Sequence, residues 1–248
     1  MMTILVLKIG GNDIDDAAFL AALVAAVAAM RPLPVLVHGG GKEIGQLQVA
    51  LGGQPQFVSG LRVTDRTALM AAEMVLCGSV STRIVAALVR AGVDAQGLSG
   101  VDRGLIRAKK LAHAEGDLGF VGTPTAVRAA VLSDLLQAGV VPVIAPISLG
   151  DEGQYNLNAD EAAGAVAAAL GDAEVVFVTN VPGVLVEGVL AAQLDRQQVL
   201  ELIERGVIIG GMIPKVRAAL AALHAGVRTA RITNLAGLSD GTGTLITR

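Results

Sequence analysis

Two lysines stand where a fixed positive charge could assist a reaction on an anion. Lys8 interrupts the apolar run Thr3–Ile9 and is followed directly by Gly10-Gly11. Lys215 follows Pro214, a residue that suits the first turn of a helix, so its ammonium group would lie near a positive helix end. The alternatives are a Lys8 stem that lies along the sheet with its ammonium group in water, and a solvated helix lysine at position 215.

Glycines follow three predicted strands. They form Gly10-Gly11, Gly39-Gly40-Gly41 and, after Asn180, the single Gly183. Because glycine lacks a Cβ atom, an anion can approach the backbone N–H groups of such turns. Each turn alone could be a tight strand-to-helix connection, but two of them after neighbouring N-terminal strands favour an anion site. Neither matches a Walker A loop or a GxGxxG fingerprint.

The polar run Asn156-Leu157-Asn158-Ala159-Asp160 stands just before an apolar helix. An Asn or Asp at this place is usually the N-cap. A cap at Asp160 would leave Asn156 and Asn158 unexplained.

Arg62 lies just ahead of a helix that is predicted to begin at Thr64 or Asp65. Its planar guanidinium group could bind a carboxylate through two parallel hydrogen bonds, or form an ordinary surface salt bridge. His38 precedes the triple glycine, but no partner is spaced as in a catalytic triad or a metal site. We interpret His38 as structural.

Short β-branched runs alternate with Ala-rich helical stretches along the chain. Strands are predicted at Thr3–Ile9, Leu33–Val37, Val140–Ala145, Glu174–Thr179 and Arg228–Thr233, with further short strands and a hairpin between Ala95 and Gly122. Helices are predicted at Ala17–Met30, Ile44–Leu51, Asp65–Leu76, Val80–Ala91, Thr125–Ala138, Asp160–Leu170, Arg196–Arg205 and Pro214–Ala225. This alternation predicts an α/β fold, a three-layer αβα sandwich around a mainly parallel sheet. Ligands bind beyond the carboxyl ends of the strands in such sheets, where the glycines lie.

Composition narrows the function classes. The formal net charge is −3 and no basic cluster would follow a phosphate backbone, so nucleic acid is not expected as a partner. The single Cys77 excludes an internal disulfide and a multi-Cys metal site. The longest apolar run, Ala17–Met30, is shorter than the roughly 20 residues of a membrane span and lacks the basic flank of a signal peptide. We expect no membrane association, no metal site within the protein, and a cytoplasmic location.

Several of these segments together resemble the N-acetylglutamate kinases, a branch of the amino acid kinase family. They follow the order and approximate spacing of that branch: Lys8-Ile9-Gly10-Gly11, His38-Gly39-Gly40-Gly41-Lys42, Gly60-Leu61-Arg62-Val63-Thr64, Asn156-Leu157-Asn158-Ala159-Asp160 and Gly211-Met212-Ile213-Pro214-Lys215. The Lys-x-Gly-Gly opening is shared by the wider family, whereas the Gly-Leu-Arg-Val-Thr and Asn-x-Asn-Ala-Asp segments together point to the acetylglutamate branch.

The resemblance covers nearly the whole chain and implies two lobes that share one sheet. Residues 1–172 would form an N-terminal lobe that binds the acyl amino acid and dimerises, and residues 173–248 a C-terminal lobe that binds the nucleotide. Arginine-sensitive relatives carry an additional N-terminal helix, whereas only Met1 and Met2 precede the first strand here. The resemblance therefore implies a homodimer that arginine does not inhibit.

The resemblance also implies a role for individual residues. Lys8 and Lys215 would neutralise charge on the transferring phosphoryl group, with Asp160 holding both ammonium groups, and Gly11 and Gly40 would donate backbone N–H groups to it. The acetylated amino acid would bind Gly40, Gly41, Arg62 and Asn156. ATP, which arrives with Mg²⁺, would bind Thr179, Asn180, Gly183, Leu185, Val207 and Ile209.

The implied reaction is the ATP-dependent phosphorylation of the γ-carboxylate of N-acetyl-L-glutamate to an acyl phosphate, a step of arginine biosynthesis. A γ-carboxylate with a pKa of about 4.3 is ionised at neutral pH, so it needs no general base. Phosphoryl transfer requires positioning and charge neutralisation, which two fixed lysines would supply.

Two other functions stay open on the sequence alone. A kinase for carrier-linked aminoadipate in lysine synthesis should carry extra basic residues at the substrate mouth, and Arg103, Arg107, Lys109 and Lys110 form a modest cluster. A non-catalytic amino-acid-sensing domain of the same fold should lack one of Lys8, Asp160 or Lys215, and all three are present.

Overall fold

The computed structural model describes residues 3–11 and 14–248. Met1, Met2, Asn12 and Asp13 lie outside this description. The expected homodimer without arginine inhibition was argued from Met1 and Met2, so that argument concerns residues outside the description.

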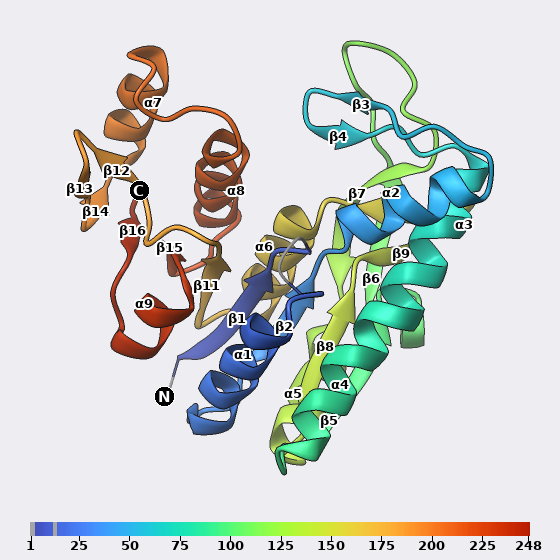
Figure 1. Cartoon of the computed structure of the whole chain (residues 1–248), viewed down its shortest axis with the longest axis horizontal. Helices are drawn as coiled ribbons and strands as arrows, with labels where there is room; N and C mark the ends of the chain where they lie inside the picture. Colours follow the sequence, from blue (N-terminus) through green and yellow to red (C-terminus); the bar gives the residue numbers. More distant parts are fainter. Residues whose placement is uncertain (1–2, 12–13) are drawn as a thin grey trace.

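An eight-stranded sheet runs through the molecule in the order β14-β16-β15-β11-β1-β2-β8-β5 (Figure 1). Its strands are β1 (Ile4–Ile9), β2 (Val35–His38), β5 (Ala95–Ser99), β8 (Val141–Ala145), β11 (Ala173–Val178), β14 (Gln193–Leu194), β15 (Thr229–Thr233) and β16 (Thr244–Ile246). All neighbouring pairs from β15 to β5 are parallel, and β16 runs antiparallel to β15. The predicted mainly parallel sheet is confirmed.

Helices cover both faces of this sheet. They are α1 (Ala17–Ala29), α2 (Gly41–Ala50), α3 (Arg66–Glu73), α4 (Ser81–Arg90), α5 (Ala129–Gln137), α6 (Ala159–Leu170), α7 (Arg196–Glu204), α8 (Met212–His224) and α9 (Leu235–Asp240). Helices α5, α6 and α8 pack on one face, and α1, α4 and α9 on the other. This arrangement is the predicted three-layer sandwich.

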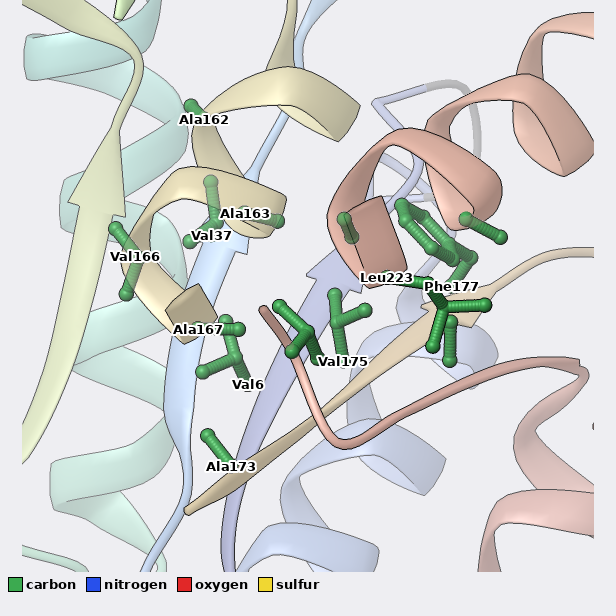
Figure 2. Packing of buried hydrophobic residues seen from close by; sticks show 14 of the residues in the cluster. Val6, Val37, Ala162, Ala163, Val166, Ala167, Ala173, Val175, Phe177 and Leu223 are labelled. Atoms are coloured by element: carbon green, nitrogen blue, oxygen red, sulfur yellow. The ribbon is translucent and has the colours of Figure 1, made fainter. Parts of the chain in front are cut away.

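The core contains few bulky rings, and small side chains let its helices approach closely. Figure 2 shows Ala163, Val166 and Ala167 of α6 above the strand residues Val6 and Val175. A Cβ atom built on Gly164 would lie 3.2 Å from the Cβ atom of Ala222 on α8, which is tighter than ordinary van der Waals contact. The Ala-rich sequence of α6 therefore reflects close helix packing.

The helices predicted at Asp65–Leu76 and Val80–Ala91 form one continuous helical run. A π-helical stretch, Met74–Val80, joins α3 to α4. By length and composition alone, Arg66–Arg90 could cross a membrane. Its inward side chains, including Leu76, Ile84 and Leu88, are buried against the sheet, so packing in the core accounts for the apolar composition.

The helix predicted at Thr125–Ala138 is wrong in its first part. Residues up to Val127 belong to β7 (Val121–Val127), and α5 begins only at Ala129. The β-branched residues that alternate along 121–127 favour a strand, and β6 (Ile106–Lys110) pairs with it in antiparallel fashion. Together with β9 (Ile147–Gly150) and β10 (Gly153–Leu157), these strands close into a small second sheet, β10-β7-β6-β9.

Two hairpins extend from the sandwich. One, β12 (Leu185–Val186) with β13 (Val189–Leu190), lies near α7, and the other, β3 (Phe57–Val58) with β4 (Leu61–Arg62), stands beside the loop that precedes β7 (Figure 1). Ser59 of the second hairpin donates a hydrogen bond to Glu115 of that loop, and the backbone N–H of Phe120 donates to the carbonyl of Thr64 at 2.7 Å. These bonds fix β4, and with it Arg62, at the carboxyl-end side of the sheet.

Candidate active site

Lys8 points away from water because of the alternation along β1. Leu7 and Ile9 pack in the core under α1, so Lys8 faces α6 on the opposite side. Its Nζ atom lies 2.9 Å from Oδ1 of Asp160, and the two side chains are only 11% and 12% exposed. No hydrogen bond of regular geometry from the described residues reaches this Oδ1 atom. The ion pair is therefore the interaction that offsets the burial of this carboxylate oxygen.

The cap of α6 explains why Asp160 is available for this pair. The Oδ1 atom of Asn158 accepts hydrogen bonds from the backbone N–H groups of Asp160, at 2.8 Å, and Glu161, at 3.3 Å. Asn158 is thus the N-cap, and the structure excludes the alternative of a cap at Asp160. Since the amide side chain satisfies the helix end, the carboxylate two residues later can turn toward Lys8.

The turns after β1 and β2 touch each other through their glycines. A Cβ atom on Gly11 would lie 2.2 Å from the backbone nitrogen of Gly40 and 2.6 Å from the carbonyl carbon of Gly39. A Cβ atom on Gly40 would lie 2.8 Å from the side chain of Leu76. No side chain fits between these turns, so their backbones meet at the ends of two adjacent strands.

His38 supports the second turn from inside the core. It is completely buried, and its Nδ1 atom lies 3.1 Å from the carbonyl oxygen of Gly39, while Nε2 has no partner among the described groups. Burial lowers the pKa of His38 to about 4, so the ring is neutral at physiological pH. The interpretation of His38 as structural agrees with this environment.

Arg62 is held over helix α2. Its Nη1 atom donates to Oε1 of Gln48 at 3.0 Å, and its Nη2 atom donates to the carbonyl oxygen of Gly41 at 2.7 Å. Its Cζ atom lies 4.7 Å from the ring centre of Phe57, the residue opposite it in the β3–β4 hairpin. Burial lowers the pKa of the guanidinium group. Among the described residues, no carboxylate lies within ion-pair distance of it.

Asn156 reaches the same region from β10. Its Nδ2 atom donates to Oγ1 of Thr64 at 3.3 Å, and Thr64 in turn donates to the carbonyl of Arg62 at 2.9 Å. Asp65 caps α3 by accepting from the backbone N–H of Ala68 at 2.7 Å, as predicted for one of the two candidate positions.

One cavity of about 220 Å³ brings most of the predicted residues together. Its lining includes Lys8, Gly11, Gly40, Gly41, Arg62, Asn156 and Asp160. Lys8 and Arg62 place positive charge on this cavity, which suits a ligand with more than one anionic group. The residues proposed as a carrier-binding cluster do not line it, and Lys110 pairs with Asp117 at 2.8 Å.

The remaining predicted residues lie in the C-terminal part of the fold. Lys215 occupies the first turn of α8, where its Nζ atom donates to the carbonyl of Gly211 at 3.1 Å, and it does not line the cavity. Helix α8 packs against α6, the helix that carries Asp160.

The six predicted nucleotide contacts do not line the cavity either. Thr179 and Asn180 follow β11, and the Oγ1 atom of Thr179 donates to Oδ1 of Asn180 at 3.2 Å. Gly183 has a φ of 149°, and a Cβ atom on it would lie 2.6 Å from Oγ1 of Thr244. Leu185 and Ile209 are exposed apolar side chains, and Val207 is half-buried between α7 and α8.

Sequence reasoning missed the residues that hold Arg62. Gln48 is 1% exposed and lies four residues after the buried Ile44, on the inward face of α2. A polar residue at a core position of an apolar pattern is the signal that could have found it. Phe57 gave no signal, because a single exposed aromatic residue is common on protein surfaces.

The fold and this cavity define a small-molecule kinase architecture, and the comparisons agree. The chain belongs to the amino acid kinase family, whose family model matches residues 3–234. Among individual relatives, the acetylglutamate kinase of Roseiflexus sp. (strain RS-1) is 69% identical over 243 residues, which cover 98% of this chain and 93% of that protein.

More distant proteins match nearly the whole of this chain. The acetylglutamate kinase of Methanopyrus kandleri is 45% identical, covering 97% of this chain and 99% of that protein. A crystal structure from Streptococcus mutans UA159 superposes with a TM-score of 0.84 at 34% identity and covers 98% of both chains. N-acetylglutamate synthase from Neisseria gonorrhoeae, complexed with coenzyme A and N-acetyl-glutamate, superposes with a TM-score of 0.84 at 28% identity, with 99% of this chain covering 59% of that chain.

Proposed function

We propose that this protein transfers the γ-phosphoryl group of ATP to the γ-carboxylate of N-acetyl-L-glutamate, as an acetylglutamate kinase of arginine biosynthesis. The observation that carries the proposal is one cavity lined by both an ammonium group and a guanidinium group. The ammonium group is held by Asp160 beside two touching glycine turns, and the guanidinium group has no acidic partner among the described residues. The first arrangement suits a phosphoryl group and the second a carboxylate. The high identity to proteins named acetylglutamate kinase supports the choice of amino acid.

The proposed roles follow from these positions. Arg62 binds the α-carboxylate of the amino acid, and Asn156 and the Gly40-Gly41 backbone bind its acetylated amide. The γ-carboxylate, ionised at neutral pH, attacks the γ-phosphorus atom without a general base. Lys8 neutralises charge on the transferring phosphoryl group, and the N–H groups of Gly11 and Gly40 donate to its oxygens.

The nucleotide is assigned to the C-terminal lobe, residues 173–248, and the amino acid to residues 1–172. Exposed Leu185 and Ile209 offer apolar surface for an adenine ring, and Thr179 and Asn180 offer polar groups at the carboxyl end of β11. Lys215 on α8 then reaches the phosphates from the second lobe. Among the described residues no cluster of three acidic, His or Cys side chains could hold a metal. Mg²⁺ would accordingly arrive with the phosphates of ATP.

Turnover of ATP with three acceptors tests the proposal. Purified protein should form acyl phosphate with N-acetyl-L-glutamate, and little with glutamate or with a carrier-linked aminoadipate. A preference for the carrier-linked substrate would replace the proposed function, and the absence of turnover with all three would favour a sensing domain. Lys215→Ala should lower kcat by roughly 10²–10³-fold with little change in the KM for the amino acid. A near-normal kcat would make Lys215 an ordinary helix lysine.

We further propose a cytoplasmic homodimer that forms along the helix 66–90. The outer side of this helix exposes apolar side chains, among them Met74 at 54% and Val89 at 53%. Strand β5 at the end of the sheet lies beside this helix. Light scattering should give twice the chain mass for the wild type, and Met74→Glu should shift the protein toward monomer. A monomeric wild type would refute this part.

A further inference from the structure

The guanidinium group of Arg62 lies on one face of helix α2. It contacts Gly41 through the carbonyl oxygen and Gln48 through the side chain, and a Cβ atom on Gly45 would lie 3.7 Å from its Nη2 atom. Gly41 and Gly45 are four positions apart, and Gly45 and Gln48 are three apart, so all three residues lie on the same side of the helix. Gly41, Gly45 and Gln48 therefore line the side of α2 on which the guanidinium group lies, and the Gln48 side chain stands at one edge of this group.

Gln48 is a buried residue with both of its polar atoms satisfied. Its Oε1 atom accepts from Arg62 at 3.0 Å, and its Nε2 atom donates to the carbonyl oxygen of Gln54 at 3.3 Å. A carboxylate could accept from Arg62 but could not donate to Gln54, and an apolar side chain could do neither. Of the common side chains, an amide is the one that satisfies both neighbours at this place.

All contacts of Arg62 described here are with neutral groups: an amide oxygen, a backbone carbonyl and an aromatic ring. The positive charge of this half-buried guanidinium group is therefore not neutralised within the described part of the chain, because no described carboxylate lies within ion-pair distance of it. Two of the five N–H donors of a guanidinium group are used by Gln48 and Gly41, so three remain. Arg62 lines the cavity, so a ligand there could accept from donors that Gln48 and Gly41 do not use.

From this geometry we infer that Gln48 is a positioning residue for substrate recognition: it orients Arg62 toward the cavity with a neutral hydrogen bond, so that the guanidinium charge is reserved for a carboxylate of the acyl amino acid. The inference rests on the proposed function only for the identity of that carboxylate. A glutamate at position 48 would form an internal ion pair with Arg62 and compete with the substrate. A methionine there would leave the charge in place but remove its orientation.

The test compares substitutions at Gln48 with the same substitutions at Gln46, an exposed residue on the same helix. Binding of N-acetyl-L-glutamate is measured by calorimetry, and kcat and both KM values by coupled assay. Gln48→Glu should weaken binding of the amino acid about tenfold or more, and Gln48→Met by a smaller factor. The KM for ATP should change little in either variant. Gln46→Glu carries the same charge change and should bind like the wild type.

Several outcomes would overturn the inference. One is a Gln48→Glu variant that binds N-acetyl-L-glutamate as tightly as the wild type, and another is a Gln48→Met variant that is weaker than Gln48→Glu. A merely structural role would lower the melting temperature of both variants without moving the dissociation constant. If Gln48→Glu does not fold, an unchanged dissociation constant for Gln48→Met refutes the positioning role. If the wild type itself neither binds nor phosphorylates N-acetyl-L-glutamate, the proposed function and the inference fall together.

Discussion

Replacement of Lys8 by methionine separates the catalytic from the structural part of the Lys8–Asp160 ion pair. Methionine has similar length and fills the same space, but it leaves the carboxylate of Asp160 without Lys8 as partner. The two side chains are 11% and 12% exposed, so water compensates little of the lost interaction. Loss of one partner of such a pair costs about 3 kcal/mol of stability. Loss of a cation at the phosphoryl group should lower kcat by roughly 10²–10³-fold.

The double variant Lys8→Met with Asp160→Asn distinguishes the two effects. The neutral amide removes the uncompensated charge, so most of the lost stability should return. The kcat value should stay low, because no ammonium group of residue 8 faces the phosphoryl group. Urea denaturation gives the free energy of unfolding, and a coupled assay at saturating substrates gives kcat. Recovery of kcat in the double variant, or near-normal kcat in Lys8→Met alone, would refute the assignment of Lys8 to catalysis.

Further predictions concern the turn, the buried histidine and the arginine. Gly11→Ala should lower kcat at least tenfold, because its Cβ atom would lie 2.2 Å from the backbone nitrogen of Gly40. The control is Gly78→Ala, because a Cβ atom on Gly78 meets no described atom within 4 Å. Equal activity of the two variants would contradict the close contact. Burial lowers the pKa of His38 to about 4, so between this value and about 6.5 only the unfolded chain binds the proton, and stability should fall by about 3 kcal/mol as the pH drops from 7 to 4. The free energy of unfolding from urea titrations should depend less on pH in His38→Asn than in the wild type. The same pH dependence in both proteins would rule out this role of His38. Arg62→Lys should raise the KM for the amino acid and leave that for ATP unchanged; a change confined to ATP would reverse the assignment of the lobes.

The sandwich was predictable because its signals are local. Apolar runs of strand length, ended by glycine and followed by Ala-rich helices, determine both element type and parallel pairing. The same reasoning located Lys8, since a charged residue in a buried strand must find a partner or reach water. The sequence could not identify whether Asn158 or Asp160 caps α6, because both have suitable side chains. The structure resolves this through two backbone donors that reach Asn158.

Other features depend on contacts between distant segments, and the sequence offers little guide to them. The Gln48–Arg62 hydrogen bond joins helix α2 to a hairpin after it, and only the orientation of β4 brings these side chains together. The helix predicted from Thr125 begins too early because the alternating β-branched residues of 121–127 continue β7 to Val127, where β6 pairs with it.

The position of β1 has a consequence for the synthesis of the chain on the ribosome. Strand β1 is translated before the other strands described here, yet one of its two neighbours is β11, where Ile4 lies opposite Ala173. At ordinary elongation rates of about 5–20 residues per second, that edge stays unpaired for roughly ten to thirty seconds. An apolar strand with an open edge is a template for aggregation, and a lysine within the strand is a common protection against it. We therefore expect Lys8 to limit aggregation of the nascent chain before the active site forms, and Lys8→Met should reduce the soluble yield more than its equilibrium stability accounts for.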